Sequence, residues 1–293
     1  TLSGSAGLSS TVPLVEPGGT DVLSPNIGMG YSQTPTITYQ PLQGEDFLKK
    51  ILAPIPLEAL LILTQSGWKI DRVLSLISEK TNDVANAPSA SGPTPLYPPR
   101  YQEFKEMAAM LRSFQKDDAL IIETRKDQAG SAKVHLSFKE QKASQDEINR
   151  FCSLLGLSAE LSDYIITDTR GPLNKNKIIL QTRSMMGVLF LLGQNINIPQ
   201  RDIDKGLVTI TRYDDGQIFN WSDVTGDLLQ IHSSAEPLPP ENTFVRVRYR
   251  NAWYFIKDED LNSKSTFMLL NQLFNLQAGE ISTVAPTLTI PVN

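Results

Sequence analysis

The sequence contains one cysteine, Cys152, and two histidines, His135 and His232. An intrachain disulfide and a four-cysteine zinc site are therefore excluded, and a histidine-rich metal site lacks ligands. Cys152 falls on the apolar stripe of a predicted helix, so we expect a packed core thiol. We expect no metal and no cofactor. A single thiol fits the cytosol and equally a secreted protein that uses no disulfides.

Long apolar runs are also missing. The best candidate, residues 57–63, is far shorter than the roughly 18–20 apolar residues that span a bilayer. No segment has the pattern of a signal peptide, and the chain begins at Thr1, so we expect an N-terminus that was cut in the cell or during cloning. Residues 1–19 are rich in Ser, Gly and Thr, which is typical of a flexible tether. Such a tether suits a lipid-anchored envelope protein; a remnant of an expression vector is the alternative.

An excess of basic residues is the third absence. The net charge of −5 argues against a broad nucleic-acid-binding surface, and we expect no nucleic-acid partner. With 40% hydrophobic and 20% charged residues, the chain can bury a core. Its 293 residues are about twice the roughly 150 expected for one domain. One long domain and two smaller ones are both compatible with this length.

The pattern of turn-forming and apolar residues divides the chain into four parts. Residues 1–33 are the tether, residues 34–85 a helical subdomain, residues 86–99 a linker rich in Pro, Ser and Gly, and residues 100–293 an α+β domain. We expect the last part to be a mixed, mainly antiparallel sheet packed with amphipathic helices. The fold class predicted for the whole chain is therefore α+β.

Within the helical subdomain, a proline limits residues 35–39 to an edge strand. Apolar spacing predicts three short helices, at residues 47–52, 57–65 and 70–79. Gly67 follows the second of these and is its expected C-cap.

In the α+β domain, the helical periodicity is strongest at residues 101–114, 148–155 and 184–192, the last apolar on all sides and so expected to be buried. Ser144 and Glu147 form a capping box before the second of these helices. Strands are predicted at residues 119–124, 134–138, 163–167, 177–181, 208–212, 218–221, 228–232 and 287–292. The first is an apolar run expected to be buried. The second alternates, and it places His135 on the polar side, toward solvent.

Residues 244–277 predict a β-hairpin followed by an amphipathic helix. If Asn251 and Ala252 form a two-residue turn, apolar residues face one side of the hairpin and arginines the other. The expected pairs are Tyr249 with Tyr254, Val247 with Ile256, Arg250 with Trp253, Arg248 with Phe255 and Arg246 with Lys257. Because alanine does not tolerate a positive φ, a longer loop is the alternative. The helix is expected to have its N-cap at Asn262 or Ser263 and to end at Gly279.

The arginine side of the hairpin is the candidate binding surface, formed by Arg246, Arg248, Arg250, Trp253 and Phe255. Guanidinium groups over aromatic rings favour carboxylates, phosphates, glycans or a protein partner. The alternative is a solvated sheet face on which the arginine stems cover the rings. A third interpretation is that the arginines pair with an acidic element of the same chain.

Catalytic motifs are few. No Gly-x-Ser-x-Gly, P-loop or dinucleotide-binding pattern occurs. Two Ser-x-x-Lys pairs match the spacing of penicillin-recognising serine enzymes, Ser66 with Lys69 and Ser113 with Lys116. Neither pair is accompanied by a Lys-Thr-Gly element, and we expect no catalytic residues. The acidic pairs Asp117-Asp118 and Asp214-Asp215 fall at turn or helix-end positions, where a solvated turn is expected.

Three segments carry a resemblance to a known family: residues 34–56 (TPTITYQPLQGEDFLKKILAPIP), 91–95 (SGPTP) and 262–279 (NSKSTFMLLNQLFNLQAG). They resemble uncharacterised envelope lipoproteins of Gram-negative bacteria, over most of the chain from about residue 22 onward. The resemblance implies a periplasmic location at the outer membrane, reached through an N-terminal lipid anchor whose cysteine lies outside this chain. It supplies no functional residues.

Two functions remain open at the level of sequence. The first is a non-enzymatic periplasmic binding or scaffold lipoprotein of a cell-envelope assembly. Its partner is an envelope protein or a second copy of the chain, and the lipid anchor is its only membrane contact. The second is a serine hydrolase or penicillin-interacting enzyme that uses a Ser-x-x-Lys pair.

Overall fold

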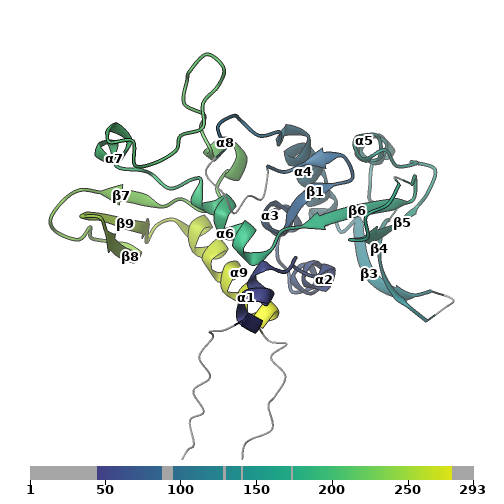
Figure 1. Ribbon diagram of the computed structural model, residues 1–293. Helices are drawn as coiled ribbons and strands as arrows, with labels where there is room; N and C mark the ends of the chain where they lie inside the picture. Colours follow the sequence, from purple (N-terminus) through teal and green to yellow (C-terminus); the bar gives the residue numbers. More distant parts are fainter. Residues whose placement is uncertain (1–44, 88–94, 128–129, 140, 173, 279–293) are drawn as a thin grey trace, which may run out of the picture. The chain divides into compact units, whose positions relative to one another are not determined.

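The computed structural model describes residues 45–87, 95–127, 130–139, 141–172 and 174–278 (Figure 1). The fold is α+β, as the sequence predicts. Its helices are α1 Glu45–Leu52, α2 Leu57–Gln65, α3 Ile70–Ile77, α4 Gln102–Lys116, α5 Gln145–Leu155, α6 Met185–Gly193, α7 Gln200–Asp204, α8 Ser222–Thr225 and α9 Leu261–Ala278. Its strands are β1 Ser78–Thr81, β2 Val84–Ala85, β3 Leu120–Lys126, β4 Ala132–Phe138, β5 Asp163–Thr167, β6 Lys177–Thr182, β7 His232–Ser234, β8 Thr243–Tyr249 and β9 Ala252–Lys257.

Within the described residues, the strands form two sheets. The larger has the order β2-β1-β6-β5-β4-β3, and the smaller has the order β7-β9-β8. Neighbours in both sheets are antiparallel except β5 and β6, which run parallel. The predicted mixed, mainly antiparallel sheet is therefore confirmed.

Strand β4 shows why the larger sheet packs on one face. Val134, Leu136 and Phe138 alternate along the strand and are buried, as residues on one face of a pleated strand must be. Leu136 lies between Ile122 of β3 and Tyr164 of β5. Strand β3 was predicted to be buried, but its residues are half-buried or exposed. Strand β3 is the last strand of the described sheet. No strand covers its outer edge, so its apolar side chains are less buried than those of β4.

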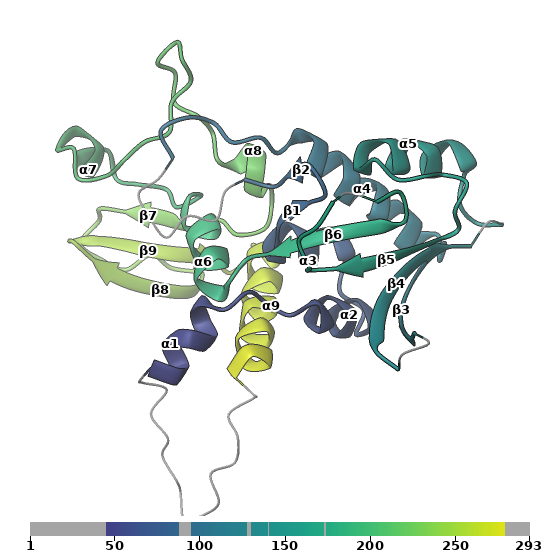
Figure 2. The same cartoon turned by 45° about the vertical axis from the view of Figure 1, so that its right-hand side comes forward.

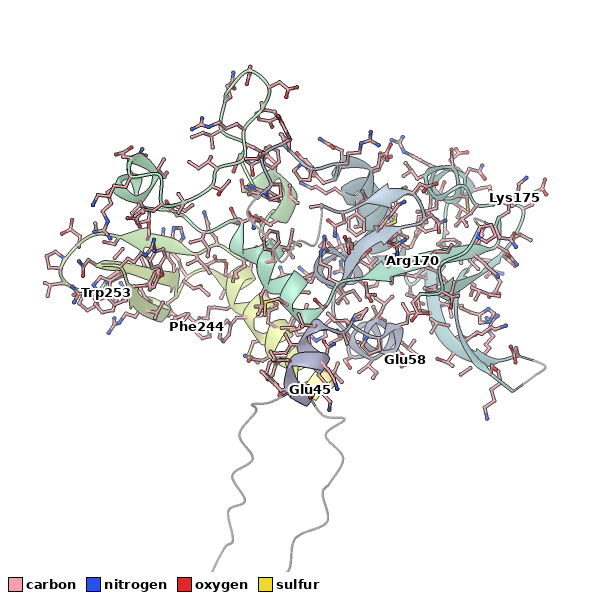
Figure 3. The ribbon with its side chains drawn as sticks, viewed as in Figure 1. Glu45, Glu58, Arg170, Lys175, Phe244 and Trp253 are labelled. Carbon is pink, nitrogen blue, oxygen red and sulfur yellow. The ribbon has the colours of Figure 1, made fainter. Side chains whose placement is uncertain are left out.

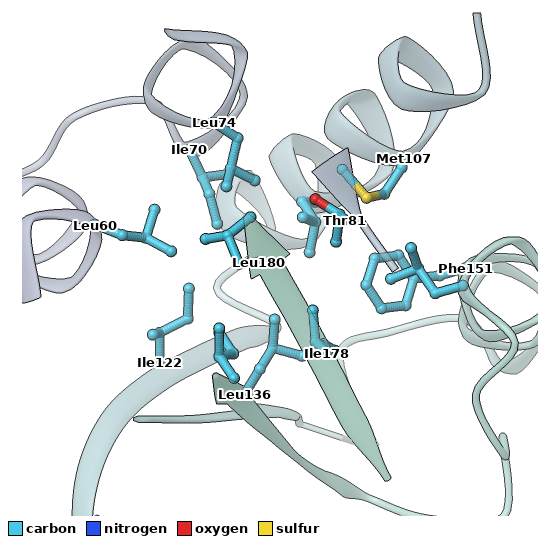
Figure 4. A pocket seen from close by; sticks show the side chains of 13 residues that line it. Leu60, Ile70, Leu74, Thr81, Met107, Ile122, Leu136, Phe151, Ile178 and Leu180 are labelled. Carbon is cyan, nitrogen blue, oxygen red and sulfur yellow. The ribbon is translucent and has the colours of Figure 1, made fainter. Parts of the chain in front are cut away.

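Helices supply the other half of the core, with buried side chains from α2 to α6 and from α9. Figure 4 shows Leu60, Ile70, Met107 and Phe151 converging with sheet residues around a small apolar cavity. These side chains come from both the predicted helical subdomain and the predicted α+β domain, and one buried cluster joins them. In the part of the chain that the structure describes, the two predicted segments therefore share a single core.

Arg183 ties the predicted linker to this core. Its guanidinium is buried and donates to the carbonyls of Leu76 (3.2 Å) and Ala87 (2.9 Å), and also to those of Ser78 and Asn86. Burial lowers the pKa of Arg183 to about 9. Residues 86–87, the start of the predicted linker, are consequently fixed by hydrogen bonds to a side chain nearly 100 positions away.

Several predicted elements differ from the structure. The helix at 70–79 ends at Ile77, because the next residues form β1 against β6. Residues 208–212 and 218–221 form no strands; they meet in one isolated bridge, between Arg212 and Ile218. The strand predicted at 228–232 begins only at its last residue, as β7. Helix α6 is not buried all round, since Met186 and Leu189 are exposed.

Two of the predicted helix caps also differ from those in the structure. Ser144 is the N-cap of α5, but its side chain makes no capping hydrogen bond. Helix α9 begins one residue before the predicted cap, because Asp260 accepts from the backbone N–H (3.0 Å) and the hydroxyl (2.5 Å) of Ser263. Helix α5 ends at Gly156, which adopts the left-handed conformation. The predicted tether (1–33), the strands at 35–39 and 287–292 and the terminator Gly279 lie outside the described residues.

Candidate binding surface on the three-stranded sheet

The hairpin of β8 and β9 turns one residue earlier than the sequence predicts. Tyr249 pairs with Ala252 across the turn residues Arg250 and Asn251. Both turn residues have positive φ, 48° and 57°, which is the type I′ geometry of a two-residue hairpin. Asparagine adopts this conformation readily, whereas Ala252 would not have. The alanine instead occupies a fully buried strand position.

This turn changes every predicted cross-strand partner but keeps the two faces. The observed pairs are Arg248 with Trp253, Arg246 with Phe255, Val247 with Tyr254 and Val245 with Ile256. The pairing has slipped by two residues in total, and side chains alternate with a period of two, so the residues of these four pairs stay on their predicted sides.

The structure brings Arg246, Arg248, Trp253 and Phe255 together on one face of the small sheet. The guanidinium of Arg248 lies 5.7 Å from the centre of the Trp253 ring, within cation–π range. Arg246 is placed by a hydrogen bond to the carbonyl of Pro240 (3.1 Å). Figure 3 labels Trp253 and Phe244 on this sheet.

Arg250 does not continue this row. It lies in the turn, and its guanidinium sits 5.5 Å from the centre of the Tyr249 ring, on the opposite face. Its carbonyl accepts a hydrogen bond from Arg201 of α7. Arg201 is thus a further cation beside the hairpin that the sequence analysis missed. Nothing in the spacing of residues 200–204 could have placed α7 there, because a contact across 49 positions has no local pattern.

The hairpin arginines Arg246, Arg248 and Arg250 have no carboxylate partner in the described part of the chain. Their side chains are exposed, and within the described ranges none of them forms an ion pair. By contrast, Arg125 contacts Asp163 at 2.8 Å. The charge of this surface is therefore not neutralised by the described part of the chain.

Strand β8 is the edge of the smaller sheet as far as the structure describes it. Its apolar side chains are unusually open: Val245 is 41% exposed, Val247 61% and Tyr249 59%. Phe244 at its start packs against Phe267 of α9, with ring centres 5.8 Å apart. An exposed apolar edge strand is a template for pairing with another chain.

Burial shifts the pKa of two titrating groups on β9 and β7 of this sheet. The pKa of Tyr254 is raised, first by burial and then by the nearby Asp202. The pKa of His232 is lowered by burial and by the charge of Lys257. The His232 ring lies 5.6 Å from that of Phe255, so at neutral pH it adds an uncharged ring to the surface.

The Ser-x-x-Lys pairs are arranged differently from each other. Ser66 is the C-cap of α2, and its hydroxyl donates to the carbonyl of Ile62 (2.7 Å). Gly67, at φ 90°, then turns the chain, so Ser66 and Lys69 do not share a helix. Ser113 and Lys116 lie on the last turn of α4. The structure places neither serine beside the candidate binding surface.

The remaining sequence candidates have structural partners. Asp118 is held by Lys139 (2.8 Å) and Lys142 (2.5 Å), which lower its pKa to about 2. Asp118 is therefore ion-paired and is not a solvated turn carboxylate. Asp215 lies in a turn, and its side chain accepts a hydrogen bond from a backbone N–H of that turn. His135 lies on the polar face as predicted but is not simply solvated, because its Nδ1 is 2.7 Å from Asp163.

Cys152 is a buried core thiol, as predicted, 3.2 Å from the hydroxyl of Tyr164. Burial raises the pKa of its thiol. No cluster of three or more His, Cys, Asp or Glu side chains suited to a metal ion occurs in the described residues. Among the described helices, none has both the length and the apolar character needed to cross a bilayer.

No protein-family model, curated protein or solved structure matches this chain. The resemblance to envelope lipoproteins therefore stays a prediction carried by residues 34–56, 91–95 and 262–279.

Proposed function

We propose that this protein is a non-enzymatic binding or scaffold protein of a cell-envelope assembly, and that it holds a protein partner at the hairpin of β8 and β9. The observation that carries this proposal is the unpaired charge of Arg246 and Arg248 beside an exposed apolar edge. Exposed apolar side chains gathered on one strand and rimmed by polar residues mark interaction sites, and exposed arginines beside them favour a partner of opposite charge.

The composition of the surface supports a protein partner. Arginine, tryptophan and tyrosine are the residue types enriched at the energetic centres of protein interfaces. The contact with Trp253 orders the long Arg248 side chain before binding. Ordering in the free state reduces the conformational entropy that association would otherwise cost.

The cellular setting is proposed from the resemblance and from composition. The envelope lipoproteins that the chain resembles imply a periplasmic location at the outer membrane. The Ser-, Gly- and Thr-rich residues 1–19 have the composition of a tether between an anchor and a folded domain. On this proposal the lipid anchor is the only membrane contact.

Site-specific crosslinking in the host bacterium tests the proposal. A benzoyl-phenylalanine in place of Tyr249 keeps an aromatic side chain at an exposed position and should give one discrete adduct with another envelope protein. The adduct should disappear when Arg246→Glu and Arg248→Glu are combined. It should persist with Arg170→Glu, which reverses an exposed arginine in the loop after β5 (Figure 3).

Two outcomes would overturn the proposal. One is the lack of any adduct from position 249 in the natural host. The other is labelling of the purified protein by a serine-reactive fluorophosphonate or penicillin probe that is lost in Ser66→Ala or Ser113→Ala. The second outcome would favour the hydrolase. Fractionation of envelope membranes tests the proposed location separately.

A further inference from the structure

The backbone of β8 offers hydrogen-bonding groups on its outer side. In a two-residue hairpin the pair that flanks the turn, here Tyr249 and Ala252, is hydrogen-bonded. Antiparallel pairs alternate between hydrogen-bonded and non-hydrogen-bonded. Arg248 with Trp253 and Arg246 with Phe255 are consequently non-hydrogen-bonded pairs. The N–H and C=O groups of Arg246 and Arg248 therefore point away from β9, toward the outer edge.

We propose that β8 binds an extended segment of a partner protein, added as an antiparallel strand, in which acidic and apolar residues alternate. This inference rests on the proposed function and names its partner class. The backbone groups of Arg246 and Arg248 form the ladder to the new strand, as in other cases of β-strand addition.

The alternation of β8 dictates the alternation of its partner. Side chains directly opposite Arg246 and Arg248 lie on the arginine face, where opposite charges are stabilising and like charges destabilising. Acidic residues two positions apart fit there. Side chains opposite Val245, Val247 and Tyr249 lie on the other face, where these three residues are exposed. Apolar residues fit at those positions, because they remove that surface from water.

A second copy of the chain fits this edge poorly. Two edge strands pair through residues whose backbone N–H and C=O groups point outward. A β8–β8 contact would therefore bring Arg246 and Arg248 opposite the same arginines of the other copy or opposite its Phe244. Arginines facing arginines on one side of a strand pair repel. Charge therefore favours a different chain over self-association.

The undescribed ends of this chain also lack the required pattern. Residues 1–44 contain two acidic residues, Glu16 and Asp21, and residues 279–293 contain one, Glu280. None of these is two positions from another acidic residue. The ends cannot place two carboxylates opposite Arg246 and Arg248.

A short peptide series tests the inference with the full chain. The probe is a fluorescent, end-blocked peptide, Thr-Val-Glu-Val-Glu-Val-Thr, and the matched controls carry Gln or Lys in place of both Glu residues. Binding is measured by fluorescence anisotropy. The Glu peptide should bind most tightly, and combining Arg246→Glu with Arg248→Glu should weaken it about tenfold, since two attractive pairs become repulsive. The Lys peptide should gain affinity for that double variant.

A second pair of variants separates the backbone ladder from charge. Arg246→Ala and Arg246→Pro remove the same charge, but only proline removes the outward N–H, and prolines are tolerated on edge strands. Proline should weaken the Glu peptide further than alanine does. Equal affinity for the Pro and Ala variants would contradict strand addition.

Other results would overturn the inference in distinguishable ways. If the three peptides bind equally or not at all while the adduct from position 249 persists in cells, the proposed function stands and the partner class is wrong. An intrachain adduct would identify the chain's own ends as the occupant. A dimer in sedimentation that Arg246→Pro abolishes would identify a second copy.

Discussion

Arg72 of α3 donates hydrogen bonds to both oxygens of Asn262 on α9, to the carbonyl at 2.7 Å and to the side chain at 2.9 Å. The two residues are 190 positions apart in the chain. The same guanidinium donates to Thr266 (3.0 Å), and burial lowers its pKa. Figure 2 shows α9 beside α1, where the rings of Phe47 and Phe274 lie 6.2 Å apart. Hydrogen bonds from α3 and an aromatic contact from α1 therefore hold α9, the helix that follows the hairpin, against the N-terminal helices.

Arg72→Met should therefore destabilise the whole described fold. Removing the guanidinium leaves the buried hydroxyl of Thr266 and the two oxygens of Asn262 without their charged donor, and hydrogen bonds to charged groups are each worth about 1.5–3 kcal/mol. We expect the free energy of unfolding to fall by about 3 kcal/mol in urea denaturation. Arg170→Met, at an exposed position, should change it by less than about 0.5 kcal/mol. A similar loss in both variants would refute the specific role of Arg72.

The hairpin turn can be tested with three substitutions. Asn251 has φ 57°, so Asn251→Ala should cost about 1 kcal/mol, whereas Asn251→Gly should be neutral or slightly stabilising. Ala252 is fully buried in β9, so Ala252→Gly should destabilise by about 0.5–1 kcal/mol. Thermal melting distinguishes the observed turn at Arg250 and Asn251 from the predicted turn at Asn251 and Ala252. With the predicted turn, Ala252→Gly would raise the melting temperature.

Arg248→Glu should leave the fold intact. The side chain is exposed and touches Trp253 through one cation–π contact, worth about 0.5–1 kcal/mol at an exposed site. We expect the free energy of unfolding to fall by no more than about 1 kcal/mol, measured beside Arg170→Glu. Unfolding of this variant at room temperature would show that Arg248 is structural, and the binding surface would lose its best-placed residue.

The carboxyl of Asp118 should titrate near pH 2, because Lys139 and Lys142 stabilise its charged form. Its pKa is lower in the folded chain than in the unfolded chain. Its contribution to stability is therefore present above the unfolded pKa of about 4 and is lost as the pH falls through about 2. Carbon-detected NMR should find this midpoint, and Lys139→Gln combined with Lys142→Gln should return it toward about 4. An unchanged midpoint in the double variant would contradict the assignment.

Sequence patterns predicted elements well where burial follows a regular period. Strand β4 and helix α4 were predicted to within two residues at each end, because their buried side chains recur every second or every third to fourth position. The predictions failed where pairing decides the structure. Residues 208–212 alternate like a strand, yet no described strand lies beside them to complete a ladder. Residues 78–79 were predicted as the end of a helix, yet they belong to β1, which pairs with β6.

The candidate surface was predicted in part. The alternation of residues 244–257 alone determined that Arg246 and Arg248 share a face with Trp253 and Phe255. Side-chain direction in a strand depends only on local geometry, so an error of one residue in the turn did not disturb it. The sequence likewise determined the α+β class and the buried state of Cys152.

Only the tertiary structure decided which residues meet across long separations. It removed Arg250 from the row by placing it in the turn, brought Arg201 to its carbonyl and buried Arg183 among carbonyls of residues 76–87. It also decided that β8 has one neighbour in the described sheet, which leaves its arginines and valines exposed. Hydrogen-bond partners and solvent exposure depend on the packing of the whole chain, and no local period encodes them.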